Sequence, residues 1–531
     1  MSTLFSLPPP APRTRLVLAL VLFAAVLWCV HAWLTLARPE RALFSFDSAE
    51  YALAGRELAR TGVLATPYSY VGALRAGERP PYPLLAGHPL LPLLEAPVFR
   101  VFGAHPWGSL VPVAAAYLVS VALTFLLAVE CGGSWPVAAL ASVAIAASPA
   151  VLGNATDGLS ELPFAAAWTG ALLVLARFRR APRAFLLGAL LGLAHLARPV
   201  VVPTLPAWFV AVASAAGPGS SLRVRRVAEL LAGFAPFALS ILLYKWRATG
   251  SPFTDVGGVM LLVGLSPRFQ PQDVARLLHP PDAVMWIRTH PEAFAHKLAG
   301  SLPFMAAQMV HLGGWIIGLA FVVWIVRPRR DGAGPLRLVS GWALGALAGL
   351  AALTLPRGQY VFPMLPAAVA LGAGELERLG RAARLPRGLP LAIVAGVLSW
   401  SSLRPLAAEW ASIRRTTRPA AAFDETDLVR FGHAVAARVP AGTLVASDMA
   451  PWVSWYAERP SVNVPLSTDD LAELRAQHGL GAVVLTNEWL VTLPGNEGWR
   501  DAFEGRVVPP GWSLGDTLAF GRLRARLLFP R

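Results

Sequence analysis

The sequence is poor in charged residues, in cysteine and, above all, in lysine. Charged side chains make up 15% of its 531 residues, whereas soluble globular proteins carry about 25%. Its two cysteines, Cys29 and Cys131, are too few for a disulfide framework. Lys245 and Lys297 are its two lysines. This composition excludes an ordinary soluble protein and a disulfide-stabilised one. Because 55% of the residues are hydrophobic, it predicts a polytopic membrane protein.

The motifs of soluble enzymes are also missing. The chain has no P-loop, no GxGxxG after a strand, no HExxH and no CxxC pair. The net charge of +15 could point to nucleic acid. However, the arginines lie in short loops between apolar runs, which is the positive-inside pattern of membrane proteins. We therefore expect no nucleic-acid partner. The sequence offers no convincing set of metal ligands, which leaves dependence on a divalent cation open.

Long apolar runs are what the sequence has in abundance. About 20 apolar residues cross the core of a bilayer. Eleven charge-poor runs come near that length: 16–37, 108–129, 134–153, 161–176, 184–197, 199–218, 227–244, 298–326, 338–355, 358–374 and 388–404. They predict an α-helical polytopic membrane protein with about eleven transmembrane helices, the first of which is retained as a span.

Arginine placement predicts the orientation of these spans. The segments "RTR", "RFRRAPR", "RVRR", "RPRRDGAGPLR" and "ERLGRAARLPR" all fall on one side, which is the cytoplasmic side by the positive-inside rule. We therefore expect a multi-pass protein of the inner (plasma) membrane with a cytoplasmic N-terminus. A transmembrane module (1–404) would expose two long outer loops, 38–107 and 245–297, and an extracytoplasmic domain would follow (405–531).

The tail after residue 405 has an α/β pattern. "DLVRFGHAVAARV" has helical spacing, and "STDDLAELRAQHG" places Ser467 as N-cap and Gly479 as C-cap. "TLVAS", "SVNVP" and "GAVVLTN" are typical of short buried strands. We expect a small mixed sheet with flanking helices.

Carboxylates gather in two of the outer connections. In "FSFDSAEYALAGRELARTG" a helix from about Asp47 to Arg60 would place Asp47 and Glu50 on one face. In "NATDGLSELPF", Asp157 and Glu161 are four residues apart at the lip of a span, where a carboxylate is costly unless it faces a cavity or a partner. The alternatives are a helix cap for Asp47 and an ordinary polar loop for the second pair.

Cations occur on the same predicted side. Arg198 lies in "LAHLARPVVVP", between two apolar runs, and its planar group suits a phosphate. Lys245 and Arg247 follow a span in "YKWRATGSPF", against the positive-inside bias. The alternative for all three is anchoring at the membrane interface.

Two further segments complete the candidate site. His88 in "GHPLLPLLEAP" could bind a metal or transfer a proton, although a lone histidine is more often structural. "LPRGQYVFPMLP" supplies Arg357 and Tyr360. A cavity lined by these groups could hold an anionic lipid headgroup and a hydroxyl acceptor. A carboxylate would act there as general base, and cations would stabilise the charge on a departing phosphate.

In these segments the chain resembles the GT-C class of membrane glycosyltransferases, of the glycosyltransferase 39 or PMT_2 kind. Protein O-mannosyltransferases and the lipid A aminoarabinose transferase are relatives. The segments are "FDSAEYALAGRELARTG", "GHPLLPLL", "LSELPFAAAWTGALL", "LARP", "YKWRATGSPF" and "RGQYVFPMLPAAVAL", in this order and on one side.

The resemblance implies an activity and a role for several residues. It implies that Asp47 is the catalytic base and that Asp157, with Glu161 close by, supports substrate binding or catalysis. The donor would be a sugar carried on a polyprenyl phosphate. The sugar would be transferred, with inversion at its anomeric carbon, to a glycan, lipid or protein acceptor, and membrane lipids would surround the protein. The chain departs from its relatives at Glu50, where aminoarabinose transferases have arginine, and in the spacing of Arg357 and Tyr360.

Other functions fit part of the pattern. A ligase or polymerase of polyprenyl-linked glycans would use similar donors. A lipid or sugar transporter would show repeated halves and broken helices near the midplane, and we find no internal repeat. A non-catalytic scaffold would make the tail the working part. The sequence therefore favours a sugar transferase.

Overall fold

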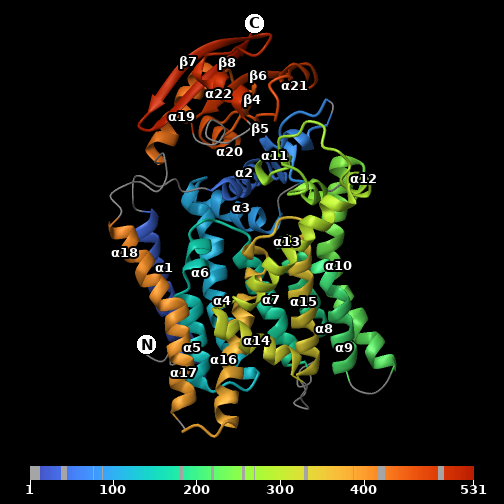
Figure 1. Cartoon of the computed structure of the whole chain (residues 1–531), viewed down its shortest axis with the longest axis vertical. Helices are drawn as coiled ribbons and strands as arrows, with labels where there is room; N and C mark the ends of the chain where they lie inside the picture. Colours follow the sequence, from blue (N-terminus) through green and yellow to red (C-terminus); the bar gives the residue numbers. More distant parts are fainter. Residues whose placement is uncertain are drawn as a thin grey trace, which may run out of the picture.

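The computed structural model shows a helical bundle with a mixed β-sheet at one end, which we call the sheet end (Figure 1). Helices α2 (Phe46–Thr61) and α3 (Leu90–Phe102) lie between the two layers (Figure 1). The opposite end of the bundle is the distal end. The structure describes residues 12–36, 45–75, 77–85, 88–178, 183–216, 220–253, 257–267, 269–327, 333–386, 388–415, 425–487 and 496–531.

Five helices within these ranges are long and apolar enough to cross a membrane, and two bent helix pairs raise the number to seven. The five are Pro12–Leu36 (α1), Pro106–Glu130 (η2, Pro106–Ser109, with α4, Leu110–Glu130), Ser220–Thr249 (α10), Gly334–Leu353 (α15) and Leu389–Ile413. The bent pairs are α5 (Trp135–Ala146) with α6 (Pro149–Ala155) at 55°, and α13 (Pro291–Val310) with α14 (Trp315–Val326) at 95°.

Each of the eleven predicted runs coincides with helix, but several of these helices are too short to span. They are α7 (Glu161–Ala176), α8 (Ala184–Ala197) and η3 (Pro199–Thr204) with α9 (Leu205–Ala215). The run at 358–374 forms η5 (Gly358–Tyr360), η6 (Phe362–Met364) and α16 (Leu365–Ala382). The structure therefore has the multi-pass helical architecture that we predicted, with full span length in five to seven helices.

The last apolar run extends beyond its predicted end at residue 404. Helix α17 (Leu389–Leu398) continues through η7 (Ser399–Leu403) into α18 (Arg404–Arg415). Arg404 does not end the helix, because its guanidinium lies 3.8 Å from the ring centre of Trp400, one turn earlier. This cation–π contact shields the charge.

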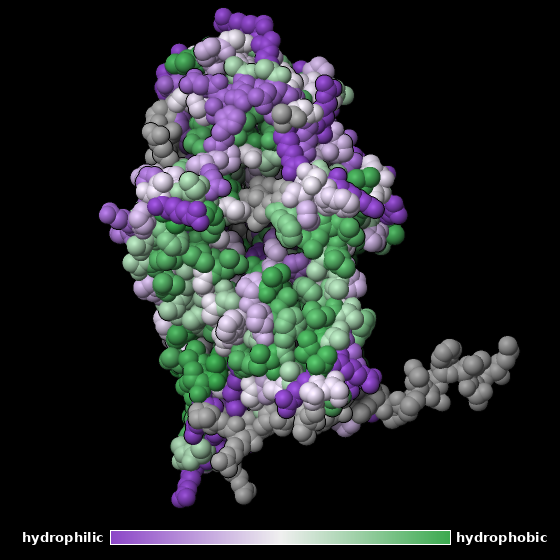
Figure 2. Space-filling view, turned by 90° about the vertical axis from the view of Figure 1, so that its right-hand side faces the viewer, coloured by the Kyte–Doolittle hydropathy of each residue, from purple (hydrophilic) through white to green (hydrophobic). Residues whose placement is uncertain are grey.

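The bundle presents a broad hydrophobic surface below the sheet end, with hydrophilic residues above and below it (Figure 2). Leu22, Val26 and Trp400 are among the large apolar side chains that are exposed. Such a band is what a bilayer would cover. At the distal end, Arg177 Nε lies 3.0 Å from Glu130 Oε2. Arg177 belongs to one of the arginine-rich connections that we predicted for one side, so the described part of that connection lies opposite the sheet.

The sheet has six strands in the order β2-β5-β4-β6-β8-β7. Strands β2, β5, β4 and β6 run parallel, and β8 joins β6 and β7 antiparallel. The strands expected in "TLVAS", "SVNVP" and "GAVVLTN" are β4, β5 and β6. The strand bounds are β2 Tyr68–Ser69, β4 Leu444–Ser447, β5 Ser461–Asn463, β6 Leu480–Thr486, β7 Trp512–Phe520 and β8 Leu523–Pro530; β1 (Ala65–Thr66) and β3 (Tyr82–Pro83) form a separate pair.

Helices cover both faces of this sheet. Alternate residues of β4 face opposite sides: Leu444 and Ala446 belong to one apolar cluster, and Val445 to another. The flanking elements are α19 (Glu425–Arg438), α20 (Ala450–Trp452), η8 (Val453–Ala457), α21 (Asp470–His478) and α22 (Glu497–Glu504). Gly479 ends α21 in the left-handed conformation as predicted, but the N-cap is Asp469 and not Ser467.

The first outer loop supplies part of this sheet. Strand β2 lies in that loop and pairs with β5 at Tyr68–Ser461 and Ser69–Val462. The hydroxyl of Tyr68 donates a 2.6 Å hydrogen bond to Asn463 Oδ1. The loop also forms η1 (Val71–Ala73). The sheet is therefore shared between the tail and the membrane module, which the division at residue 404 does not anticipate.

The second outer loop is attached to the same sheet by Arg276. This buried side chain donates to the carbonyls of Val464 and Pro465 at 3.0 and 3.1 Å, and to Asn496 Oδ1 at 3.0 Å. The short helices of the loop are η4 (Gly257–Leu262), α11 (Pro271–Val274) and α12 (Ala283–Thr289). Both outer loops are thus tied to the C-terminal residues.

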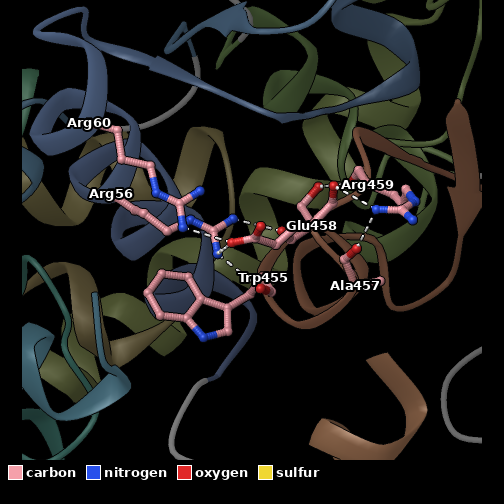
Figure 3. Close-up of polar contacts among 7 residues, drawn as sticks. Arg56, Arg60, Trp455, Ala457, Glu458 and Arg459 are labelled. Carbon is pink, nitrogen blue, oxygen red and sulfur yellow. Dashed lines mark hydrogen bonds and ion pairs between the residues drawn. The ribbon is translucent and has the colours of Figure 1, made fainter. Parts of the chain in front are cut away.

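Helix α2 contacts the bundle side and the sheet side at once. Gly55 allows α3 to approach closely, because a Cβ there would lie 2.9 Å from Glu95 Oε2. On the other side, Arg56 is buried and donates to the carbonyls of Trp455 and Ser454 at 2.9 and 2.7 Å (Figure 3). Its guanidinium also lies 4.5 Å from the centre of the Trp455 ring. A buried guanidinium with these partners fixes α2 against the tail.

Replacing this guanidinium should destabilise the full-length protein. Arg56→Met removes two charge-assisted hydrogen bonds from a buried position, which costs about 2–4 kcal/mol of unfolding free energy. The apparent melting temperature of the detergent-solubilised protein, followed by tryptophan fluorescence, should fall by several degrees.

Arg60→Met is the matched control for this change. Arg60 Nη2 pairs with Glu458 Oε1 at 2.7 Å, but both side chains are more than half exposed (Figure 3). Exposed ion pairs contribute about 0–1 kcal/mol. Equal melting temperatures for the two variants would contradict the role that we assign to Arg56.

Candidate functional site

Asp47 lies in the first turn of α2, at the sheet end of the bundle. The observed helix agrees with the predicted one, and its N-cap is Ser45, whose backbone N–H donates to Ser48 Oγ at 2.8 Å. The helix dipole favours a negative charge at this position. The side chain of Asp47 is exposed, so the cap is made by other residues and the carboxylate is available to a ligand.

Asp157 holds the start of this helix. Its Oδ1 accepts hydrogen bonds from the Ser45 backbone N–H at 3.2 Å and from Ser48 Oγ at 3.3 Å. The structure therefore brings the predicted second carboxylate to the helix that carries Asp47. Its hydrogen bonds there are those of a positioning residue.

On one side of Asp47 lies a buried ion pair. Glu161 opens α7, and Oε1 of its carboxylate accepts a short hydrogen bond from Arg198 Nη2. Arg198 Nε donates to Ser160 Oγ at 3.3 Å, and this hydroxyl lies 3.4 Å from the Tyr51 hydroxyl. Buried pairs of this kind need such additional hydrogen bonds to offset desolvation.

Tyr360 and Arg357 extend this cationic side. The guanidinium of Arg198 lies 5.9 Å from the ring centre of Tyr360. Arg357 is exposed, and its charge acts on both Asp47 and Tyr360. Within the described part of the chain, Arg357 forms no ion pair, so no salt bridge compensates its charge. Arg357 and Tyr360 both lie at the site, although their spacing in the sequence differs from that expected in the relatives.

His88 lies against Tyr51, and Lys245 lies within electrostatic reach of His88. The His88 ring stacks on Tyr51 with ring centres 6.4 Å apart. Burial, together with the positive charges of Arg198 and Lys245, lowers the pKa of His88 to about 3. The imidazole is therefore neutral near pH 7 and cannot serve there as a cationic acid. Arg247 is exposed at the end of α10, and no contact among the described residues joins it to this group.

Glu50 lies on the other side of Asp47. Its carboxylate is buried, and Oε2 accepts a 2.7 Å hydrogen bond from the Tyr70 hydroxyl. Burial raises the pKa of Glu50 to about 7, against the effect of the Tyr70 hydrogen bond, and the charge of Asp47 adds to the rise. Glu50 is therefore partly protonated near neutral pH, unlike an ordinary glutamate.

The surrounding protein limits the access of Asp47 to bulk water although its side chain is exposed. This desolvation raises the pKa of Asp47, and the negative charge of Glu161 adds to the rise, while Arg198 and Arg357 oppose it. A carboxylate with a raised pKa is a better proton acceptor than a free aspartate. The arrangement can therefore deprotonate a hydroxyl beside cations that stabilise an anion.

Several members of the group were not predicted from the sequence. Ser160 and Tyr51 link Arg198 to α2, Tyr70 binds Glu50, and buried His195 lies close enough to Lys245 to be affected by its charge. Tyr51 and Ser160 directly neighbour predicted residues, which was the available signal. The sequence offered no sign that Tyr70 would fold back onto α2.

No group of three or more histidine, cysteine or acidic side chains that could hold a metal ion is found over the described ranges. The carboxylates of the site instead pair with arginine, tyrosine and backbone N–H groups.

The raised pKa of Glu50 predicts a pH-dependent effect of its removal. A carboxyl whose folded-state pKa is raised contributes stability below its ordinary pKa, near 4.5, and loses that contribution as the pH rises through about 7. Glu50→Gln should therefore nearly match the wild type at pH 4 and melt a few degrees higher at pH 8. The free-energy difference is on the order of 3 kcal/mol.

A Glu50→Gln variant whose difference from the wild type does not change with pH would refute the assignment.

The chain is similar to known proteins in sequence over part of its length and in fold over most of it. Residues 83–267 match the family model described as dolichyl-phosphate-mannose-protein mannosyltransferase, PMT_2. No curated protein matches the chain by sequence.

Solved structures share the fold over almost the whole chain. The apo structure of ArnT from Cupriavidus metallidurans superposes with a TM-score of 0.54 at 14% identity, over 98% of both chains. Its complex with undecaprenyl phosphate gives the same TM-score and identity over 97% of this chain and 98% of ArnT. The oligosaccharyltransferase of Archaeoglobus fulgidus, crystallised with zinc and sulfate, gives 0.55 at 12% identity over 88% of this chain and 67% of its own.

The family match begins at residue 83 within the first outer loop and ends at residue 267 within the second, so it includes Asp157 and Arg198 but not Asp47. The resemblance that the sequence predicted is therefore confirmed: the chain is similar to the PMT_2 family and has the fold of GT-C glycosyltransferases.

Proposed function

We propose that this protein transfers a sugar from a polyprenyl-phosphate donor to the hydroxyl group of an acceptor, with inversion at the anomeric carbon and Asp47 as general base. The observation that carries the proposal is an exposed carboxylate within electrostatic reach of two arginines, Arg198 and Arg357. Asp47 can accept a proton while Arg198 and Arg357 stabilise a leaving phosphate.

The reaction is a single displacement. The acceptor oxygen attacks the anomeric carbon as Asp47 takes the hydroxyl proton. The bond between that carbon and the phosphate oxygen breaks, and its electron pair remains on the phosphate. Arg357 is the cation best suited to meet this new charge, since Arg198 already pairs with Glu161. Tyr360, beside both arginines, can donate a hydrogen bond to the same phosphate.

A lipid-linked donor fits the rest of the molecule. The structural relative ArnT binds undecaprenyl phosphate, and this chain has none of the nucleotide-binding motifs that a sugar nucleotide would need. The candidate site lies at the end of an apolar bundle, where a polyprenyl tail could remain in the bilayer while its phosphate reaches the arginines (Figure 1).

The location of the reaction follows from the charge pattern. We propose that the N-terminus is cytoplasmic, that the sheet end is extracytoplasmic and that the protein resides in the plasma membrane. The arginine-rich connections at the distal end support this orientation. We further propose that the membrane module (1–404) and the C-terminal residues (405–531) act as one unit, since both outer loops are bonded to the sheet.

Replacing Asp47 tests the proposed base. The full-length protein in nanodiscs would receive undecaprenyl-phosphate esters of radiolabelled hexoses and pentoses, together with extracted envelope lipids, glycans and proteins. Asp47→Asn should lower transfer of label at least 100-fold, because a general base contributes about 10²–10⁴-fold. In the wild type, kcat/KM should rise with pH through a pKa above that of ordinary aspartate, about 3.9, and then level off.

Asp516→Asn, the same change at an exposed ion pair with Arg438, is the matched control and should retain activity. Full transfer by Asp47→Asn would show that another group is the base.

The orientation can be tested without a substrate. If the tail is extracytoplasmic, alkaline phosphatase fused after Arg531 should be active. Green fluorescent protein fused at the same position should then not fluoresce. Strong fluorescence with an inactive phosphatase would overturn the topology.

A further inference from the structure

Lys297 is one of the two lysines of the chain, and the reaction proposed above gives it no role. It lies in α13, and only 7% of its surface is exposed. Burying a charged side chain is costly unless the charge is paired or hydrogen-bonded. We propose that Lys297 is a positioning residue, which holds the segment that carries Arg357 and so places the guanidinium for the leaving phosphate.

The ammonium group of Lys297 joins two segments that meet beside α13. Its Nζ donates hydrogen bonds to the carbonyl of Leu353 at 2.7 Å and to the carbonyl of Leu261 at 3.1 Å. Leu353 is the last residue of α15. The final carbonyls of a helix have no partner within the helix, and the helix dipole favours a cation beside them. Leu261 belongs to η4, so Lys297 fastens the end of α15 to the second outer loop.

Arg357 follows this fastened helix end by four positions. The residues between Leu353 and Gly358 belong neither to α15 nor to η5, so their position depends on the elements that they touch. Leu355 packs against the apolar side chains of the second outer loop. A Cβ atom on Gly358 would lie 2.5 Å from Gln308 Oε1, which belongs to α13. The segment that carries Arg357 is therefore held on both sides by α13 and the second outer loop.

Lys297 is the hydrogen-bonded part of this attachment. The second outer loop is itself bonded to the C-terminal sheet through Arg276. Without the ammonium group, the end of α15 would lose its bond to this anchored loop. Arg357 has extended backbone (φ −135°, ψ 141°) and an exposed side chain, so a turn of the segment would be carried to the end of a long side chain. The effect on the phosphate rests on the proposed function, in which Arg357 meets that group.

A double-mutant cycle tests whether Lys297 acts through Arg357. Native mass spectrometry of the detergent-solubilised full-length protein would measure its affinity for undecaprenyl phosphate. Arg357→Gln should weaken binding about tenfold, because it removes a hydrogen bond to a charged group. Lys297→Met should weaken binding about threefold to tenfold in the wild type, but less than about twofold in the Arg357→Gln protein, since coupled residues are not additive.

Arg459→Met is the matched control for the loss of a cation. Arg459 also donates to carbonyls at the end of a helix, those of Ala436 and Val439, both at 2.8 Å, but this helix is α19. Its replacement should leave the affinity for undecaprenyl phosphate unchanged. A melting temperature for each variant separates loss of binding from loss of fold, and Lys297→Gln takes the place of Lys297→Met in the cycle if the methionine variant does not fold.

Two results of the cycle would overturn the positioning role. One is wild-type affinity in a folded Lys297 variant. The other is an equal loss of affinity on replacing Lys297 with and without Arg357, because damage that is independent of Arg357 adds to its removal.

A distance measurement without any ligand separates this proposal from the proposed function. Spin labels would be attached at Arg357→Cys and at Ala476→Cys, which is exposed on α21, after both native cysteines are replaced by serine. The distribution of distances between the labels should widen on replacing Lys297 and stay the same with Arg459→Met. An unchanged distribution for the Lys297 variant would overturn the positioning role.

The two measurements together distinguish the failure of each proposal. A widened distribution combined with wild-type affinity of Arg357→Gln for undecaprenyl phosphate would refute the role of Arg357 in the proposed function and leave its positioning by Lys297 intact. A loss of affinity in Arg357→Gln without any effect of Lys297 would have the opposite meaning.

Discussion

The attachment of α2 at both of its ends is the constraint on which the candidate site depends. Asp157, from the bundle, accepts hydrogen bonds from the first turn. Arg56, near the other end, is buried against the tail. These contacts at both ends fix the direction of the helix, and with it the position from which Asp47 projects relative to the ion pair of Glu161 and Arg198.

This constraint produces two different electrostatic environments within one helical turn. On one side of Asp47 the neighbours are guanidinium groups and Tyr360, which favour an anion. On the other side they are Glu50 and tyrosines, which favour neutral hydroxyl groups. A reaction that separates a phosphate from a sugar needs both environments close together, and the periodicity of the helix supplies them.

Much of this arrangement could be predicted from the sequence, because apolar runs and arginine placement decide which loops share a side of the membrane. The group around Asp47, Glu161, Arg198 and Tyr360 was found in this way. Contacts between loops that are far apart in the chain could not be predicted from the sequence. Tyr70, Tyr82 and the two-residue strand β2 have no periodicity of their own. Strand β2 is positioned by pairing with β5, and Tyr82 by the pairing of β3 with β1. The number of full spans also escaped prediction, since short buried helices and lipid-spanning ones have the same composition.

The shared sheet has a consequence for how the protein is made. Tyr68 and Asn463, which bond to each other, are 395 positions apart. At about 5–20 residues per second, the ribosome needs roughly 20–80 seconds to proceed from one to the other. During that time the spans enter the bilayer, while the edge that β2 will occupy does not yet exist. The position of Tyr68, in the loop that follows α2, is therefore fixed only when the last part of the chain has emerged. A nascent protein that has all its spans still lacks a finished site.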